Sequence, residues 1–134
     1  MSKCILVVDD EEDAQAIAQL ALEMKTDWNV LTASSGQEAL SMAAAHQPDV
    51  ILLDMMMPDM DGRMTLQHLK ANPATRQIPV ILITAKVQPS EQASLAELDV
   101  VAVFAKPYRP LTLADQIVEA LGNETSQGES DELD

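Results

Sequence analysis

The sequence predicts a single α/β domain built on a doubly wound parallel sheet, with helices packed on both faces. Segments with strand character and segments with helical character alternate five times along the chain. Several of the strand-like segments are apolar without interruption, as strands covered on both faces must be. The length of 134 residues suits one domain, and a hydrophobic fraction of 47% supplies its core.

Five short segments have the composition of β-strands. They are rich in aliphatic residues, many of them β-branched, and polar or turn-forming residues bound them. Because strands that alternate with helices are joined by right-handed crossovers, we expect them to form a parallel sheet. The expected strands are Lys3 to Val8, Trp28 to Thr32, Val50 to Leu53, Val80 to Thr84, and Val100 to Phe104.

A helical pattern follows each expected strand. Ser35 and Glu38 form a capping box at the start of the second helix. Pro110 and Gly122 bracket the last helix as its first residue and its stop. The expected helices are Glu11 to Lys25, Ser35 to about His46, a stretch within Pro58 to Asn72, Ser90 to Leu98, and Pro110 to Leu121. The residues expected on their inner faces include Ala14, Ile17, Ala18, Ala21 and Met24 in the first helix, and Leu113, Ile117 and Leu121 in the last.

The charge balance narrows the classes of partner. A net charge of -14, from 22 acids and 8 bases, disfavours nucleic acid and anionic membranes. No apolar run approaches the roughly 18 residues of a membrane span, and no signal peptide is recognisable. Cys4 is the only cysteine, which excludes an internal disulfide. We therefore expect a cytoplasmic protein, with the domain over residues 1–121 and a disordered acidic tail over residues 122–134.

Chemically reactive side chains stand at the carboxyl ends of the expected strands. Asp9 and Asp10 follow the first, Asp54 the third, Thr84 ends the fourth, and Lys106 follows the fifth. Taken singly, each has a plainer interpretation as a helix cap, a loop acid or a solvated charge. In a parallel sheet, however, these ends share one edge, where ligands bind. Three carboxylates repel one another there unless a cation neutralises them.

The types of side chain at this edge indicate which cation would bind there and which reaction the site could support. Oxygen donors without His or Cys suit a hard ion, Mg²⁺ before Zn²⁺. A carboxylate can attack phosphorus and become an acyl phosphate. A metal, an ammonium group and a hydroxyl are the natural stabilisers of the charge on a transferring phosphoryl group. The residues at this edge therefore predict phosphoryl transfer.

These residues resemble those of the receiver domains of two-component response regulators. The run from Asp54 to Gly62 is similar to the family's stretch around its phosphoacceptor. The other matching motifs, in the family's order, are Asp9-Asp10, Thr84-Ala85 and Lys106-Pro107. The resemblance covers roughly residues 3 to 121, and it implies a flavodoxin-like fold with strand order 2-1-3-4-5 and five helices.

The resemblance also implies roles for individual residues. Asp54 would accept a phosphoryl group from a phosphohistidine of a sensor histidine kinase or a histidine phosphotransfer protein. Asp10 would bind Mg²⁺ directly, Asp9 largely through water, and the backbone carbonyl of Met56 would complete the protein's ligands, with Asp54 beside them.

Further roles concern the response to phosphorylation. Thr84 would hydrogen-bond the phosphoryl group, Lys106 would pair with it, and the peptide bond before Pro107 would be cis. Val103 stands where the family often has an aromatic switch residue. We expect the neighbouring Phe104 to be a core residue, because adjacent strand side chains point to opposite faces.

Other readings remain open at this level. An enzyme acting through an aspartyl phosphate typically has a second acid two residues after the nucleophile, where this chain has Met56. In the receiver family that this chain resembles, the positions of Met56 and Lys86 vary from member to member and are associated with the rate of phosphate loss. A binding module that is not phosphorylated usually lacks one of the acids or the lysine. A dinucleotide site would need a glycine-rich turn after the first strand.

Two modes of output also remain open for a receiver without an output domain. It can act as a stand-alone switch that binds a target on the face made by its fourth helix and fifth strand. It can equally act as a relay intermediate that passes the phosphoryl group to a histidine phosphotransfer protein.

Overall fold

A five-stranded parallel sheet forms the centre of the computed structural model, which describes residues 3–55, 62–84, 100–105 and 109–122. The strands run in the order β2-β1-β3-β4-β5, and every neighbouring pair is parallel. Their bounds are β1 (Cys4–Val8), β2 (Asn29–Ala33), β3 (Val50–Asp54), β4 (Val80–Thr84) and β5 (Ala102–Ala105). The predicted doubly wound sheet and its strand order are confirmed.

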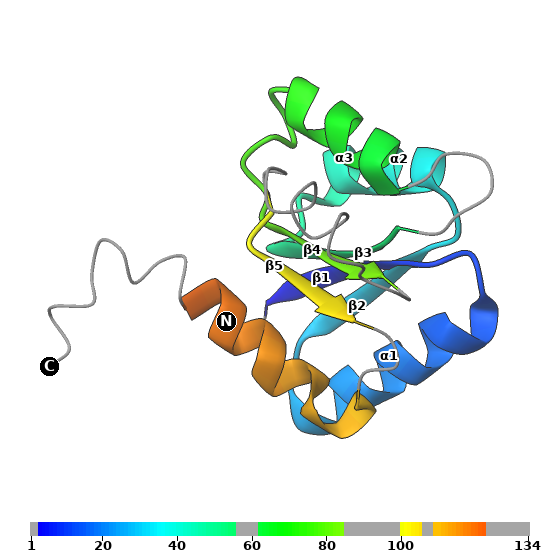
Figure 1. The fold of residues 1–134 in the computed structure, drawn as a ribbon, viewed down its shortest axis with the longest axis vertical. Coiled ribbons are helices and arrows are strands. Elements are labelled where there is room, and N and C mark those ends of the chain that lie inside the picture. Colours follow the sequence, from blue (N-terminus) through cyan, green and yellow to red (C-terminus); the bar gives the residue numbers. More distant parts are fainter. Residues whose placement is uncertain (1–2, 56–61, 85–99, 106–108, 123–134) are drawn as a thin grey trace, which may run out of the picture.

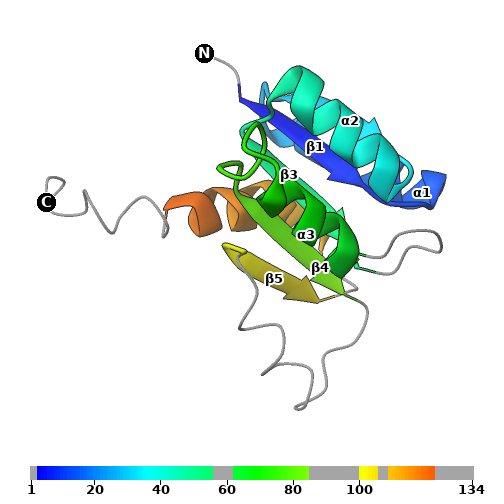
Figure 2. The ribbon, with the colours of Figure 1, turned by 90° about the horizontal axis from the view of Figure 1, so that it is seen from above.

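Helices cover both faces of this sheet, as Figures 1 and 2 show. α2 (Gly36–His46) and α3 (Gly62–Ala71) lie on one face. α1 (Glu12–Lys25) and the helical residues 113–122 lie on the other. The helix expected over residues 90–98 and the acidic tail from residue 123 lie outside the described residues. None of the helices within the described part of the chain has the length and hydrophobicity that a membrane crossing requires.

The core consists of two clusters, one on each side of the sheet. Leu6 and Val8 of β1 pack in the cluster under α2 and α3, whereas Ile5 and Val7 pack in the cluster under α1 and the last helix. This alternation follows from the two-residue period of a strand. Burying both faces of the central strands holds their carboxyl ends in one row.

The face of α1 that packs against the sheet differs from the predicted one. Ala18, Ala21 and Leu22 are buried, as expected for two of them, but Ile17 is 50% exposed and Met24 is 64% exposed. At 3.6 residues per turn, the stripe through residues 18 and 22 and the stripe through residues 17 and 24 are neighbours. Spacing alone could not choose between them, and the sheet selected the stripe that carries Leu22.

The ends of two other helices agree with the sequence in part. The side chain of Ser35 accepts a hydrogen bond from the Glu38 amide at 3.1 Å, as in a capping box. The Glu38 carboxylate, however, accepts from the amide of Ser34 at 2.8 Å, one residue earlier than the box predicts. Pro110 opens a short 3-10 turn (Pro110–Thr112) before the last helix, whose Leu113 and Ile117 are fully buried.

Candidate functional site

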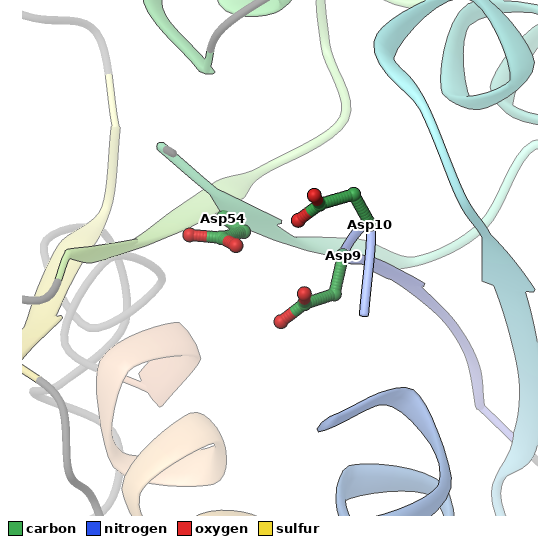
Figure 3. A group of neighbouring side chains, drawn as sticks. All are labelled: Asp9, Asp10 and Asp54. Atoms are coloured by element: carbon green, nitrogen blue, oxygen red, sulfur yellow. The ribbon is translucent and has the colours of Figure 1, made fainter. Parts of the chain in front are cut away.

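Three carboxylates meet at the carboxyl edge of the sheet, the edge at which the parallel strands end. Asp9 and Asp10 follow β1, and Asp54 is the last residue of the adjacent β3. One carboxylate oxygen from each residue lies within 4.8 Å of the other two. Figure 3 shows these side chains gathered in front of the two strand ends. We call this group the acid cluster.

The members of the acid cluster differ in their contact with solvent. Asp9 is 5% exposed and Asp54 is 2% exposed, while Asp10 is exposed. Like charges at this spacing repel, and burial of two of them strengthens the repulsion because less water screens it. The cluster is therefore an arrangement that a bound cation would stabilise.

The donor set fits a hard divalent cation. All three ligand groups are carboxylates, and neither His nor Cys belongs to the cluster. In an octahedral Mg²⁺ site with oxygen ligands at about 2.1 Å, adjacent ligands would lie about 3.0 Å apart and opposite ones about 4.2 Å apart. Oxygens that lie within 4.8 Å of one another can approach such spacings through rotation of their side chains.

Asp9 is held by hydrogen bonds to its backbone and to its side chain. Its amide donates to the carbonyl oxygen of Ala33 at 3.0 Å, which continues the ladder between β1 and β2 past the strand end. Its Oδ1 atom accepts from the amide of Glu11 at 3.0 Å. Its carbonyl oxygen accepts from the Nε2 atom of Gln15 at 2.6 Å. These bonds orient the carboxylate toward the site before any ligand arrives.

Gln15 is a participant that the sequence did not reveal. Its Nε2 atom lies 3.1 Å from the Ala33 carbonyl oxygen and 3.1 Å from the Ser34 Oγ atom, in addition to the contact with Asp9. No spacing rule connects a residue in the first turns of α1 with the end of β2. The contact exists only because the sheet places β1 and β2 side by side.

Gly62 sets the distance between α3 and the end of β3. Its amide donates to the Met55 carbonyl oxygen at 3.1 Å. A Cβ atom at this position would lie 2.6 Å from the Met55 Cα atom and 3.0 Å from the Asp54 carbonyl oxygen. Glycine is therefore required at the start of α3, next to the backbone of Asp54 and Met55. The Asp-Gly pair before a helical pattern was the available sequence signal for this close approach.

Thr84 ends β4, the strand next to the one that Asp54 ends, and its predicted role toward a phosphoryl group stays a prediction. It is 7% exposed and follows Ile83, the register partner of Asp54. The remaining predicted site residues, Met56, Lys86, Lys106 and Pro107, lie outside the described residues.

The two candidate switch positions on β5 point to opposite faces. Phe104 is half-buried and packs against the core cluster under the last helix, whereas Val103 is 36% exposed. The core position expected for Phe104 therefore agrees with the structure. The possible switching role of Val103 remains a prediction.

The fold and the acid cluster define a doubly wound α/β domain with an acidic site at the carboxyl edge of its sheet. Residues 5–118 match the family model of the response regulator receiver domain. The chain belongs to this family. Receiver domains partner with histidine kinases and are signalling modules rather than enzymes.

The chain is similar to regions of larger response regulators and to isolated receiver structures. It is 39% identical over 138 residues to the response regulator PleD of Caulobacter vibrioides, covering 96% of this chain and 30% of that protein. The N-terminal domain of a response regulator receiver protein from Methanoculleus marisnigri shares 38% identity, with a TM-score of 0.72 over 90% of this chain and 94% of that one. A signal receiver domain of a histidine kinase from Syntrophus aciditrophicus shares 29% identity, with a TM-score of 0.80 over 91% and 92% of the two chains. The chain thus spans about a third of the length of the curated relative.

Proposed function

We propose that Asp54 accepts a phosphoryl group from a phosphohistidine, on a sensor kinase or a histidine phosphotransfer protein, with Mg²⁺ as cofactor. The chain then signals through the change of its surface. A phosphohistidine donor and millimolar Mg²⁺ point to a cytoplasmic location. The observation that carries the proposal is the acid cluster, with three carboxylate oxygens within 4.8 Å of one another at the edge where Asp54 ends its strand.

The transfer exchanges one bond to phosphorus for another. A carboxylate oxygen of Asp54 attacks the phosphorus atom, and the bond from phosphorus to the imidazole nitrogen of the donor breaks. The electron pair of that bond remains on the imidazole, and the new bond from phosphorus to oxygen makes an acyl phosphate on Asp54. Because Asp54 is only 2% exposed, few orientations of the donor bring phosphorus to the carboxylate with the leaving nitrogen in line.

The neighbouring residues together stabilise the negative charge that develops on the phosphoryl oxygens. Asp9 and Asp10 hold the cation, assisted by the Met56 carbonyl; when bound, Mg²⁺ supplies the positive charge that the equatorial oxygens need. The Thr84 hydroxyl donates a hydrogen bond, and Lys106 contributes an ammonium group. The roles of Met56 and Lys106 rest on the family motif alone.

The test is to locate the modified residue. We expect the protein treated with acetyl phosphate and Mg²⁺ to gain one phosphoryl group, which peptide mass spectrometry places on Asp54. The variant Asp54→Asn, which keeps the side-chain volume without a nucleophilic carboxylate, loses this label completely. Asp49→Asn, at the opposite edge of the sheet, is labelled like the wild type and serves as the matched control. Full labelling of the Asp54→Asn variant would refute the assignment.

A further inference from the structure

Gln15 connects the first metal-binding acid to the turn between β2 and α2. Its amide nitrogen reaches three oxygen atoms, at 2.6 Å from Asp9 O, 3.1 Å from Ala33 O and 3.1 Å from Ser34 Oγ. A carboxamide carries two N–H donors, so one of these hydrogens is shared between acceptors. The shortest contact is the one to the carbonyl of Asp9.

We propose that Gln15 is a positioning residue, which holds Asp9 and Asp10, the acid pair after β1, in the geometry that binds the divalent cation. The proposal rests on the function proposed above for the acid cluster. Gln15 itself is not a ligand in this scheme, because all three of its contacts are made by the donating end of the amide. It acts through the backbone of Asp9.

The physical reason is the planarity of the peptide bond. The carbonyl oxygen of Asp9 belongs to the rigid plane that joins Asp9 to Asp10. A hydrogen bond to that oxygen fixes the rotation of the plane, and with it the direction in which Asp10 leaves the strand. Asp10 is the exposed member of the cluster, so packing constrains it least and the orientation of this plane matters most for it.

The Ala33 and Ser34 groups that accept from Gln15 are themselves held by hydrogen bonds. The Ala33 carbonyl oxygen accepts from both Gln15 and the amide of Asp9, which joins the two strand ends. Ser34 is held in turn through its amide by the Glu38 carboxylate at 2.8 Å. The amide of Gln15 is therefore fixed from the side of β2 and α2, and it transmits that position to the acid pair.

Position 15 demands both the length and the donor of glutamine. Alanine removes the amide altogether. Methionine keeps the length of the side chain but has no donor. Gln19 provides a matched control on the same helix, because its Nε2 atom contacts only the Glu23 carboxylate at 3.2 Å among the bonds of the described residues.

The experiment is a calorimetric titration of the intact chain with Mg²⁺ alone, in the absence of any phosphodonor. Loss of a group that orients a metal ligand typically weakens metal binding by about 10- to 100-fold. We expect Gln15→Ala and Gln15→Met to raise the Kd for Mg²⁺ by roughly tenfold, the lower end of that range, because Gln15 acts on the backbone. Gln19→Ala stays within about twofold of the wild type. Ser34→Ala has an intermediate effect, since it removes only one of the three acceptors.

A second measurement separates positioning from a loss of structure. The rate of labelling by acetyl phosphate in the Gln15 variants should return to the wild-type rate at saturating Mg²⁺, because only the affinity for the cation is impaired. A rate that stays low at saturating Mg²⁺, or a Kd unchanged in Gln15→Met while the wild type binds Mg²⁺, overturns the role of Gln15 and leaves the proposed function intact. A wild type that does not bind Mg²⁺ overturns both.

Discussion

The two edges of the sheet use aspartate in opposite ways. At the amino edge, where the strands begin, Asp49 is exposed and its Oδ2 atom accepts from the amide of Cys4 at 2.7 Å. The Asp49 amide donates to the Cys4 carbonyl oxygen at 2.7 Å, so the residue closes the ladder between β1 and β3. At the carboxyl edge, Asp9, Asp10 and Asp54 bring three charges together, two of them buried.

The difference lies in what each acid meets at its edge of the sheet. At the amino edge a single carboxylate accepts a hydrogen bond from the Cys4 amide, so its charge is met within the chain. At the carboxyl edge three carboxylates lie within 4.8 Å of one another, and each of them raises the negative charge that the others face. Acids gathered in this way favour a bound cation, which is why the acid cluster, and not Asp49, is the candidate site.

The strongest way to break this comparison is to neutralise one acid at each edge. Asp10→Asn removes the carboxylate that we propose as a direct ligand, and we expect it to weaken Mg²⁺ binding by at least about tenfold. Asp49→Asn keeps an acceptor oxygen for the Cys4 amide and should leave the Mg²⁺ affinity within about twofold of the wild type. Calorimetric titration of both variants measures the two affinities under one set of conditions. Equal losses would mean that the cation responds to total charge and not to the acid cluster.

Backbone packing at the carboxyl edge gives the next largest effect. Gly62→Ala places a Cβ atom 2.6 Å from the Met55 Cα atom, a clash with backbone that a side-chain rotation cannot relieve. We expect this variant to lose about 2 kcal/mol of unfolding free energy, as overpacked positions do, although alanine favours a helix more than glycine does. Gly122→Ala is the control, because nothing lies within 4 Å of its added Cβ atom.

Urea denaturation of the two glycine variants tests this contrast. The midpoint should fall for Gly62→Ala and stay equal or rise slightly for Gly122→Ala. If both midpoints move in the same direction, helix propensity dominates and the close approach to the backbone of Asp54 and Met55 is unimportant for stability.

The strand ends were predictable because they depend on local pattern. Asp9, Asp54 and Thr84 follow or end apolar runs, and parallel strands bring such ends to one edge whatever fills the remainder of the core. The buried face of α1 was predicted wrongly, since the pattern favoured the stripe with Ile17 and Met24 and the sheet instead buries the neighbouring stripe with Leu22. Gln15 was invisible for a related reason, because its partners belong to β2 and the turn after it.

The smallest predicted effect is on stability, and it concerns the charge repulsion within the acid cluster. A cation that binds only the native protein adds about 1.4 kcal/mol at a concentration ten times its Kd. For a domain of this size, that raises the wild-type Tm by roughly 5 °C. Asp54→Asn should start from a higher Tm without Mg²⁺, since one repelling charge is gone, and should gain less from the cation.

Differential scanning calorimetry with and without Mg²⁺ measures both shifts, and Asp49→Asn again supplies the reference at the other edge of the sheet. An Asp54→Asn variant that is less stable than the wild type without Mg²⁺ would show that the buried carboxylate is satisfied within the chain itself. The acid cluster would then be a stable network like the bond between Asp49 and Cys4. The two edges would differ in the number of acids they hold, and no longer in what those acids need.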